Sequence, residues 1–340
     1  MNGAADYLRA FETPRFACLS PNLYAASFSL MKLLPARYMV DRAAASGRLE
    51  RGGHIIETTS GTFGLAMAMV CAIRQYQLTL VTASTLTEPR FTRRLEQLGA
   101  KQVIIEDPVG DGNQSGRLEH LREMLHGHES AYWPRQYDCA DNRLAYSRLA
   151  DLAIRSFGQI DCLVGCVGTG GSLCGTGQFL RNLFPDLSIL AVDTHRSVLF
   201  GHPAGKRMLR GLGNSILPEN VLHQLIDEVH WVGALPAYAM AHALVREHAL
   251  FVGPSSGAAA LVASWYAKRN PDAKTLVIMA DEGHRYQDTI HNNIWLASLP
   301  GWPCQIPSEP VRLDRIAPAE ETAWTTYPWG RRALNEIVQS

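Results

Sequence analysis

Two hydrophobic periods alternate along the first part of the chain. Residues 54–58, 78–83 and 101–106 are short apolar runs typical of buried strands, and the segments between them carry apolar residues at helical spacing. Strands and helices that alternate in this way predict a parallel sheet in a wound α/β domain. Pro89 suits the first turn of the second helix, which we expect to end at Gly99.

The second half repeats this alternation of strands and helices. Apolar runs predict four further strands, and between them lie three helical patterns: strands 162–167, 187–193, 228–232 and 275–280, and helices 172–183, 236–248 and 256–268. Residues 108–117 and 196–220 are rich in glycine and polar or proline residues and have no period. We expect both segments to be surface or gating loops.

Composition and charge exclude several classes of protein. Lysine plus arginine equals aspartate plus glutamate, at 32 each, so no net field attracts nucleic acid or an acidic membrane. The longest apolar run, 65–73, is too short for a membrane span of about 20 residues, and the first 20 residues lack the apolar core of a signal peptide. The seven cysteines are scattered without a C-x-x-C pair, so we expect no metal site and a soluble, cytoplasmic protein.

A glycine-rich loop follows the predicted strand 162–167. Gly168-Thr169-Gly170-Gly171-Ser172 precedes a helix, so its backbone N–H groups and the helix dipole favour a phosphate. No lysine follows as in a nucleotide-triphosphate loop, and Leu173 replaces the last glycine of a dinucleotide motif, although Asp193 lies where a ribose-binding acid would. The loop could bind a dinucleotide or a phosphorylated cofactor, or could simply turn the chain.

Three other stretches carry candidate chemistry. The turn 59–64 could hold a substrate carboxylate or form an ordinary helix cap, and Ser255-Ser256 opens another predicted helix, where serine often serves as a cap. Lys32 is flanked by Leu30, Met31, Leu33 and Leu34, and a lysine in apolar surroundings loses proton affinity and becomes a nucleophile. A phosphate cup, a carboxylate cup, a hydroxyl pair and a desolvated lysine together suggest pyridoxal 5'-phosphate (PLP).

The chain resembles the cysteine synthase family of fold type II PLP-dependent enzymes from about Thr13 to Tyr286. Five ordered segments carry the resemblance: Lys32-x-x-Pro35-Ala36-x-Tyr38-Met39, Ile55-Ile56-Glu57-Thr58-Thr59-Ser60-Gly61, Val167-Gly168-Thr169-Gly170-Gly171-Ser172, Gly253-x-Ser255-Ser256-Gly257-Ala258-Ala259 and Asp281-x-Gly283-x-Arg285-Tyr286. The resemblance implies an α/β fold with two wound parallel-sheet domains and the cofactor in the cleft between them.

The resemblance also implies how the chain divides. An N-terminal segment, 1–36, would carry the cofactor lysine and cross to the C-terminal domain. A smaller α/β domain, 37–147, would bind the substrate carboxylate, and a larger one, 148–299, the cofactor phosphate. The tail, 300–340, contains prolines and tryptophans, and we expect it to pack on the body or on a partner subunit rather than to form a third domain.

Site roles follow from the same resemblance. Lys32 would hold PLP as a Schiff base and move the Cα proton, and Ser255 would face the pyridine nitrogen. Thr62 replaces an asparagine that usually bonds the cofactor's 3′-oxygen, and the glycines and Asp-Arg pair common around the lysine are absent here. The remaining expected contacts are Gly168, Thr169, Gly170, Gly171 and Ser172 to the phosphate, and Thr59, Ser60, Gly61, Phe63 and Gln136 to the substrate.

One branch of the family is more similar still. Thr59-Ser60-Gly61-x-Phe63-Gly64, Tyr132-Trp133-Pro134-x-Gln136-Tyr137 and Ser197-Val198-Leu199-Phe200-Gly201 are similar to synthases that join glutamate to O-phosphoserine. Those enzymes make N-(2-amino-2-carboxyethyl)-L-glutamate, a precursor of 2,3-diaminopropionate. The resemblance thus implies β-replacement on O-phospho- or O-acetyl-L-serine through an aminoacrylate, with small amino acids as substrates, no nucleic acid or membrane partner, and a homodimer.

Several alternatives stay open at this point. A cysteine synthase using sulfide, a non-catalytic PLP-binding protein and a dinucleotide-dependent oxidoreductase are each compatible with part of the pattern. Arg135, Lys206, Arg207 and Arg210 could each meet a phosphate leaving group or an acidic nucleophile, or could be solvated surface charges.

Overall fold

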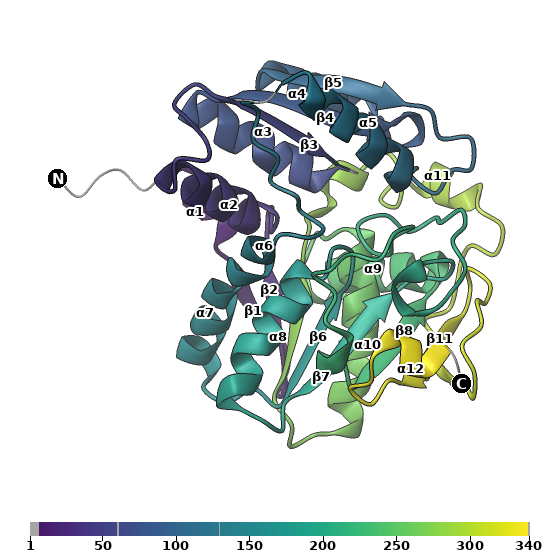
Figure 1. Ribbon diagram of the computed structural model, residues 1–340. Helices are drawn as coiled ribbons and strands as arrows, with labels where there is room; N and C mark the ends of the chain where they lie inside the picture. Colours follow the sequence, from purple (N-terminus) through teal and green to yellow (C-terminus); the bar gives the residue numbers. More distant parts are fainter. Residues whose placement is uncertain (1–6, 60, 129, 339–340) are drawn as a thin grey trace.

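The smaller of two sheets forms one end of the molecule. In the computed structural model, which describes residues 7–59, 61–128 and 130–338, β3 (His54–Thr58), β4 (Gln77–Ala83) and β5 (Ala100–Ile105) run parallel in that order. Apolar side chains of α2 (Leu33–Ala45) and α3 (Thr62–Arg74) cover one face, with Leu95 of α4 (Pro89–Gln97), and α5 (Gln114–His126) covers the other (Figure 1). These three strands and the predicted helices between them are confirmed to within two residues.

The larger sheet forms the rest of the body. Its strands follow the order β1-β2-β9-β6-β7-β8-β11-β10, and β2, β9, β6, β7 and β8 are parallel. The central strands are β6 (Cys162–Cys166), β7 (Ser188–Asp193), β8 (Glu228–Val232) and β9 (Thr275–Met279). All four were predicted from apolar runs, because a parallel sheet buries both faces of its strands.

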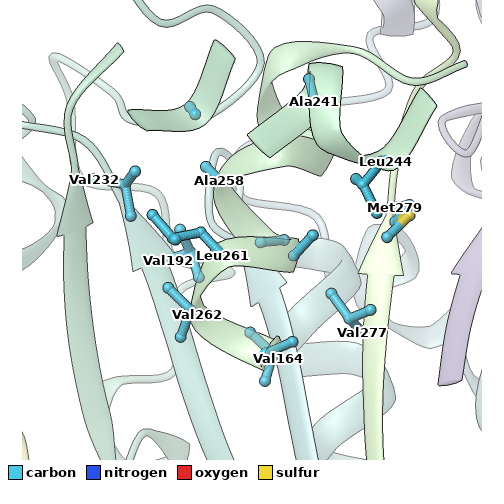
Figure 2. Packing of buried hydrophobic residues seen from close by; sticks show 14 of the residues in the cluster. Val164, Val192, Val232, Ala241, Leu244, Ala258, Leu261, Val262, Val277 and Met279 are labelled. Carbon is cyan, nitrogen blue, oxygen red and sulfur yellow. The ribbon is translucent and has the colours of Figure 1, made fainter. Parts of the chain in front are cut away.

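Helices cover both faces of this sheet. Val164, Val192 and Val277 pack beneath α9 (Ala234–His248) and α10 (Pro254–Arg269), and Figure 2 shows Leu261 and Val262 of α10 among them. The alternate residues, such as Leu163, pack against α7 (Ser147–Phe157) and α8 (Gly171–Leu183) on the opposite face. The larger sheet is therefore a core layer that can hold loops rigidly at its strand ends.

An N-terminal hairpin, not predicted from the sequence, joins this sheet. The antiparallel pair β1 (Arg15–Ser20) and β2 (Leu23–Ser27) lies at its edge, with β2 parallel to β9. Beyond β2 the chain stays close to the segment after β9, since Phe28 N donates to Met279 O and Met31 N to Ala280 O. This path delivers Lys32 to the carboxyl ends of the parallel strands, after which α2 carries the chain to the smaller sheet.

The tail completes the opposite part of the sheet. β11 (Trp324–Pro328) pairs antiparallel with β8, and β10 (Val311–Arg312) pairs with β11; the short α12 (Leu334–Val338) follows. Trp324 and Trp329 are buried. The prediction that the tail packs on the body is confirmed, although its strands were not foreseen.

Residues 196–220 were expected to be a surface or gating loop, and the structure corrects this. Leu199, Phe200, Leu209 and Leu212 are buried in the cores of the larger sheet. The Gly213 N–H also donates to Val167 O, which fixes the segment against the end of β6. Apolar residues scattered without a period gave no signal of this packing.

Short helices complete the chain: α1 (Tyr7–Glu12), α6 (Ala140–Leu144) and α11 (Asn293–Ala297). Among the described residues no helix has the length and apolar character needed to cross a bilayer. The four segment boundaries proposed from the sequence stay a prediction.

Candidate active site

The ends of the parallel strands β2, β9 and β6 place three loops at one edge of the larger sheet. Lys32 follows β2, the glycine loop follows β6, and Asp281 follows β9. Lys32 Nζ lies 3.4 Å from Thr169 Oγ1 in the glycine loop. Ligands in open parallel sheets bind at such strand ends, so this edge is the candidate site.

The amine of Lys32 is withdrawn from water. Desolvation by burial lowers its pKa from an ordinary 10.5 to about 8, because the charged form loses its hydration. About a tenth of the amine is therefore neutral at pH 7, far more than at the ordinary pKa, and a nucleophilic lysine needs the neutral form. The side chain of Lys32 is half-buried, and the lowered pKa agrees with the desolvation predicted from its apolar neighbours.

The glycine loop is built so that only glycine fits at two positions. Gly170 has a φ of +85°, and a Cβ there would overlap Asn220 O; a Cβ at Gly171 would overlap Asn142 Oδ1. The first N–H groups of the helix α8, which begins at Gly171, have no intrahelical acceptors. Gly171 N donates to Thr169 Oγ1 at 3.4 Å, and close-packed glycines at a helix start have the geometry that suits an anion.

Asn142 links this loop to Gln136. Asn142 Nδ2 donates to Thr169 Oγ1 at 3.2 Å and to Gln136 O at 2.6 Å. Asn142 is fully buried and was not singled out from the sequence. No sequence signal marked it, because it lies in a short helix, α6, remote in sequence from both loops.

The turn after β3 is shaped by its own hydroxyl. Thr59 Oγ1 accepts hydrogen bonds from Gly61 N at 3.0 Å and Gly64 N at 2.9 Å, so this side chain caps the loop and helix α3. Thr62 and Phe63 line the cavity beside Lys32, as does Gln136, whose Nε2 donates to Thr58 O. Ser60 lies outside the described residues.

A buried carboxyl, Glu57, anchors this turn and was missed as a functional candidate. It accepts hydrogen bonds from Thr58 N at 2.7 Å, Trp133 Nε1 at 3.2 Å and Gln136 N at 3.1 Å. Burial raises the pKa of Glu57 to about 7, although these donors oppose the shift. A charged residue inside the apolar run Ile55-Ile56-Glu57 was the available sequence signal.

Ser255 lies at the start of α10 and belongs to a hydroxyl–carboxyl network. Its Oγ donates to Asp281 Oδ1 at 3.0 Å, Ser256 Oγ donates to the same oxygen, and Tyr286 OH donates to Asp281 Oδ2 at 2.8 Å. Burial raises the pKa of Asp281, and the three hydroxyl bonds oppose this shift. Ser255 also lines a cavity of about 50 Å³ with Lys32.

Two adjoining cavities join the predicted residues. Lys32, Thr62, Gly168 and Thr169 line both of them. Ser172 and Ser255 line one, and Phe63 and Gln136 line the other, which has a volume of about 80 Å³. Thr59 and Gly61, by contrast, line neither cavity. They shape the turn that precedes Thr62.

Asp193, once a candidate ribose ligand, is fully buried. Its Oδ1 accepts from Thr194 N at 2.8 Å, and burial raises its pKa to about 7. A side chain enclosed in this way cannot reach a ribose, so the geometry is wrong for the dinucleotide alternative.

The residues present fit PLP. The cavity offers a reactive amine at Lys32, a phosphate cup at the start of α8, and the Ser255 hydroxyl, all at the strand ends of one sheet. This fold and site define a PLP-dependent enzyme of fold type II. Residues 27–281 match the family model described as "Pyridoxal-phosphate dependent enzyme", and the chain belongs to this family.

Relatives of known name agree with this assignment. The chain is 31% identical over 272 residues to the N-(2-amino-2-carboxyethyl)-L-glutamate synthase of Cupriavidus metallidurans, covering 78% of this chain and 80% of the relative. It is 33% identical to the protein of that name from Ralstonia nicotianae over 269 residues, covering 78% and 79%. A probable cysteine synthase of Bacillus subtilis is 33% identical over 261 residues, covering 75% and 83%.

A solved structure supports the fold. The O-acetylserine sulfhydrylase isoform 3 of Entamoeba histolytica superposes with a TM-score of 0.77, at 24% identity, covering 85% of this chain and 91% of that one. The predicted fold class and cofactor are confirmed. The chain is a PLP-dependent enzyme of the type that catalyses β-substitution.

Proposed function

We propose that the protein replaces the β-substituent of an O-activated L-serine, O-phospho- or O-acetyl-L-serine, with an amino nucleophile such as L-glutamate. The observation that carries the chemistry is the desolvated Lys32 amine, 3.4 Å from Thr169 in the glycine cup. An amine with a lowered pKa can both attach a carbonyl cofactor and exchange a proton near neutral pH. Lys32 would thus hold PLP and then carry the Cα proton of the substrate.

The cofactor phosphate would lie in the cup formed by Gly168, Thr169, Gly170, Gly171 and Ser172. Bound PLP supplies an electron sink for the charge that develops when the Cα proton leaves. Ser255 would meet the ring nitrogen, and Thr62 would lie beside the 3′-oxygen. Their positions on the cavity wall with Lys32 support these roles.

The substrate carboxylate would bind at the turn 59–61, with Phe63 and Gln136 beside it. The backbone of this turn is preset by Thr59 Oγ1 and by the Gln136 contact with Thr58 O. Gly61 N and Gly64 N bond to Thr59, and the N–H groups of Thr62 and Phe63 between them, at the start of helix α3, suit a carboxylate. A preset loop also avoids the entropy cost of ordering at each binding event.

Two relatives support an amino nucleophile, since both are named as synthases of N-(2-amino-2-carboxyethyl)-L-glutamate. The product would serve the biosynthesis of 2,3-diaminopropionate. A second candidate is cysteine synthesis from sulfide, which the name of the Bacillus subtilis relative favours.

Product identification separates these candidates. The holoenzyme is incubated with O-phospho- or O-acetyl-L-serine and either L-glutamate or sulfide, and the products are identified by mass. We expect the glutamate adduct. Cysteine as the sole product would exclude the glutamate assignment.

The role of Lys32 is tested with Lys32→Ala. We expect loss of the borohydride-reducible visible chromophore and of product formation, because the attaching amine is gone. Unchanged absorbance and activity would exclude Lys32 as the cofactor lysine.

We further propose a cytoplasmic homodimer. The resemblance supports the dimer, and the seven free cysteines, with no disulfide, support a reducing compartment. Light scattering of the purified protein tests the dimer. A monomeric mass would contradict it.

A further inference from the structure

Two arginines without an assigned role, Arg210 and Arg285, face the same cleft. Arg210 lies in the loop after Lys206, and Arg285 lies in the segment after β9. Both line the small cavity that contains Lys32, Thr62 and Ser255, and both line a larger adjoining cavity of about 500 Å³ between α4 and the 285–290 segment. The two cavities share Arg210, Arg285 and Tyr286, and of the two only the small one is lined by Lys32.

Arg210 has no counter-ion in contact. Within the ranges that the structure describes, its guanidinium forms neither a hydrogen bond nor an ion pair. The largest coulombic contribution to its pKa comes from Asp107, but Asp107 already accepts hydrogen bonds from Gly110 N at 2.9 Å, Gly112 N at 3.0 Å and the Thr85 hydroxyl. Burial lowers the pKa of Arg210, Asp107 opposes this shift, and the charge of Arg285 adds to it.

Arg285 extends over the turn proposed to hold the substrate carboxylate. Its Cζ lies 4.4 Å from the centroid of the Phe91 ring of α4, which orients the guanidinium by a cation–π contact. A Cβ added at Gly61 would lie only 2.7 Å from Arg285 Nη2, so the guanidinium rests directly on this glycine. Among described residues it has ring contacts but no hydrogen-bond acceptor.

The other cations considered from the sequence either have partners for their donors or lie exposed. Arg135 pairs with Asp138 at 3.5 Å, stacks on Trp133 and keeps about half of its side chain exposed. Arg207 lines the cavity that contains Lys32 and Gln136, but its guanidinium donates to the carbonyl oxygens of Arg196 and Asp111. Lys206 is exposed. Arg210 is thus the cation of this group whose donors remain open toward the cleft.

We propose that Arg210 and Arg285 form an anion subsite that selects ligands carrying a carboxylate or phosphate beyond the reacting carbon. Two like charges in a partly desolvated cleft repel each other until an anion binds between them, and guanidinium donors match carboxylate and phosphate oxygens in pairs. This inference rests on the proposed function and assigns its substrate class. The anion is either the distal carboxylate of the nucleophile or the phosphate leaving group.

Binding of simple anions tests the subsite without catalysis. The holoenzyme is titrated calorimetrically with glutarate and with inorganic phosphate, using wild type, Arg210→Gln and Arg135→Gln. Loss of a charge-assisted hydrogen bond weakens binding by about tenfold to a hundredfold, so we expect this loss for at least one anion in R210Q. R135Q should bind both anions as wild type does, because Arg135 is paired with Asp138 outside the cleft.

Two kinetic arms identify the source of the anion. If the subsite holds the leaving group, R210Q releases phosphate from O-phospho-L-serine at least tenfold more slowly, while acetate release from O-acetyl-L-serine stays within twofold. If it holds the nucleophile, both releases stay within twofold and the KM for glutamate rises at least tenfold, with the KM for glutamine unchanged.

The proposal is overturned if wild type binds neither anion, or if R210Q binds both within twofold of wild type. Equal losses with charged and neutral ligands would also overturn it, since these indicate a general structural defect. If wild type releases neither phosphate nor acetate, the proposed reaction has failed, whereas the calorimetric arm still decides the fate of the anion subsite.

Discussion

Lys32 Nζ lies 3.4 Å from Thr169 Oγ1, although 137 positions separate the two residues in the chain. The contact forms because the N-terminal hairpin adds β2 to β9, so that Lys32 emerges at the edge where β6 delivers the glycine loop. The geometry of the proposed site therefore depends on the docking of residues 15–27 onto a sheet built from the other half of the chain.

The lowered pKa of Lys32 predicts the pH dependence of cofactor attachment. Only the neutral amine attacks PLP, and burial places this pKa at about 8. The rate should be constant above pH 8 and fall about tenfold per pH unit below it, because the neutral fraction falls by that factor. Stopped-flow absorbance after mixing apoprotein with PLP between pH 6 and 10 measures this rate. A midpoint near 10.5, the value for an exposed lysine, would contradict the assignment.

Replacement of Glu57 by alanine should weaken both folding and substrate binding. The change leaves Thr58 N, Trp133 Nε1 and Gln136 N without their acceptor, and each unsatisfied buried donor costs about 1–3 kcal/mol. We expect a lower free energy of unfolding in urea and a higher KM for the serine substrate. The exposed Glu106→Ala serves as the control and should leave both quantities nearly unchanged; an equal effect in the two variants would contradict the role of Glu57.

The titration of Glu57 predicts a specific direction of pH dependence. Its folded pKa is raised to about 7, so the protonated carboxyl contributes stability that is present below the unfolded pKa and lost as the pH rises through about 7. Unfolding free energies measured between pH 4.5 and 8 should fall more with rising pH in wild type than in Glu57→Gln. Parallel profiles for the two proteins would show that Glu57 does not titrate in this range.

Gly171→Ala should impair the phosphate cup. The added Cβ would overlap Asn142 Oδ1, and Asn142 cannot move freely because its Nδ2 bonds both Thr169 Oγ1 and Gln136 O. We expect PLP affinity to fall at least about tenfold, as measured by fluorescence titration of the apoprotein. In Gly127→Ala the new Cβ meets Met124 O at an ordinary 3.7 Å, so this control should retain the cofactor.

Trp329→Ala tests the contribution of the tail. Trp329 is fully buried, its ring centroid lies 5.0 Å from that of Phe200, and its Nε1 donates to Arg332 O. Truncation of a buried tryptophan costs about 3–5 kcal/mol, which chemical denaturation would detect. Val311→Ala, at a position 63% exposed, should leave the free energy of unfolding nearly unchanged. An equal decrease of this free energy in the two variants would argue that the tail is not part of the core.

The sequence predicted the strands that are buried on both faces of a sheet, but it did not predict the strands near the edges. The strands β3, β6 and β9 are short apolar runs, and the structure confirms them because parallel strands pack on both faces. β1 and β11 mix polar and apolar residues near the edges of the sheet, so their pattern was indistinct. Such strands are recognised by the strands with which they pair, and this pairing is visible only in the folded structure.

The candidate site shows the same division. Lys32 and the glycine loop were found because local sequence determines their chemistry: apolar neighbours desolvate the lysine, and a strand–glycine–helix order forms the cup. That the guanidinium of Arg210 lacks a hydrogen-bond partner among the described residues could not be predicted. It depends on Asp107 accepting hydrogen bonds from Gly110 N and Gly112 N rather than from Arg210. Asn142 was equally hidden, as its contacts join segments distant in the chain.

The packing of Trp329 on Phe200 also sets an order of assembly during synthesis. Residues beside Phe200 hold Asn214, through Ser197 Oγ and Val198 N, and Asn214 Nδ2 in turn donates to Gly168 O in the cofactor cup. The smaller sheet can form early on the ribosome, but this support for the cup reaches its final packing only after Trp329 has emerged. A chain truncated before Trp324 would therefore lack the packing that supports the cup through Phe200 and Asn214.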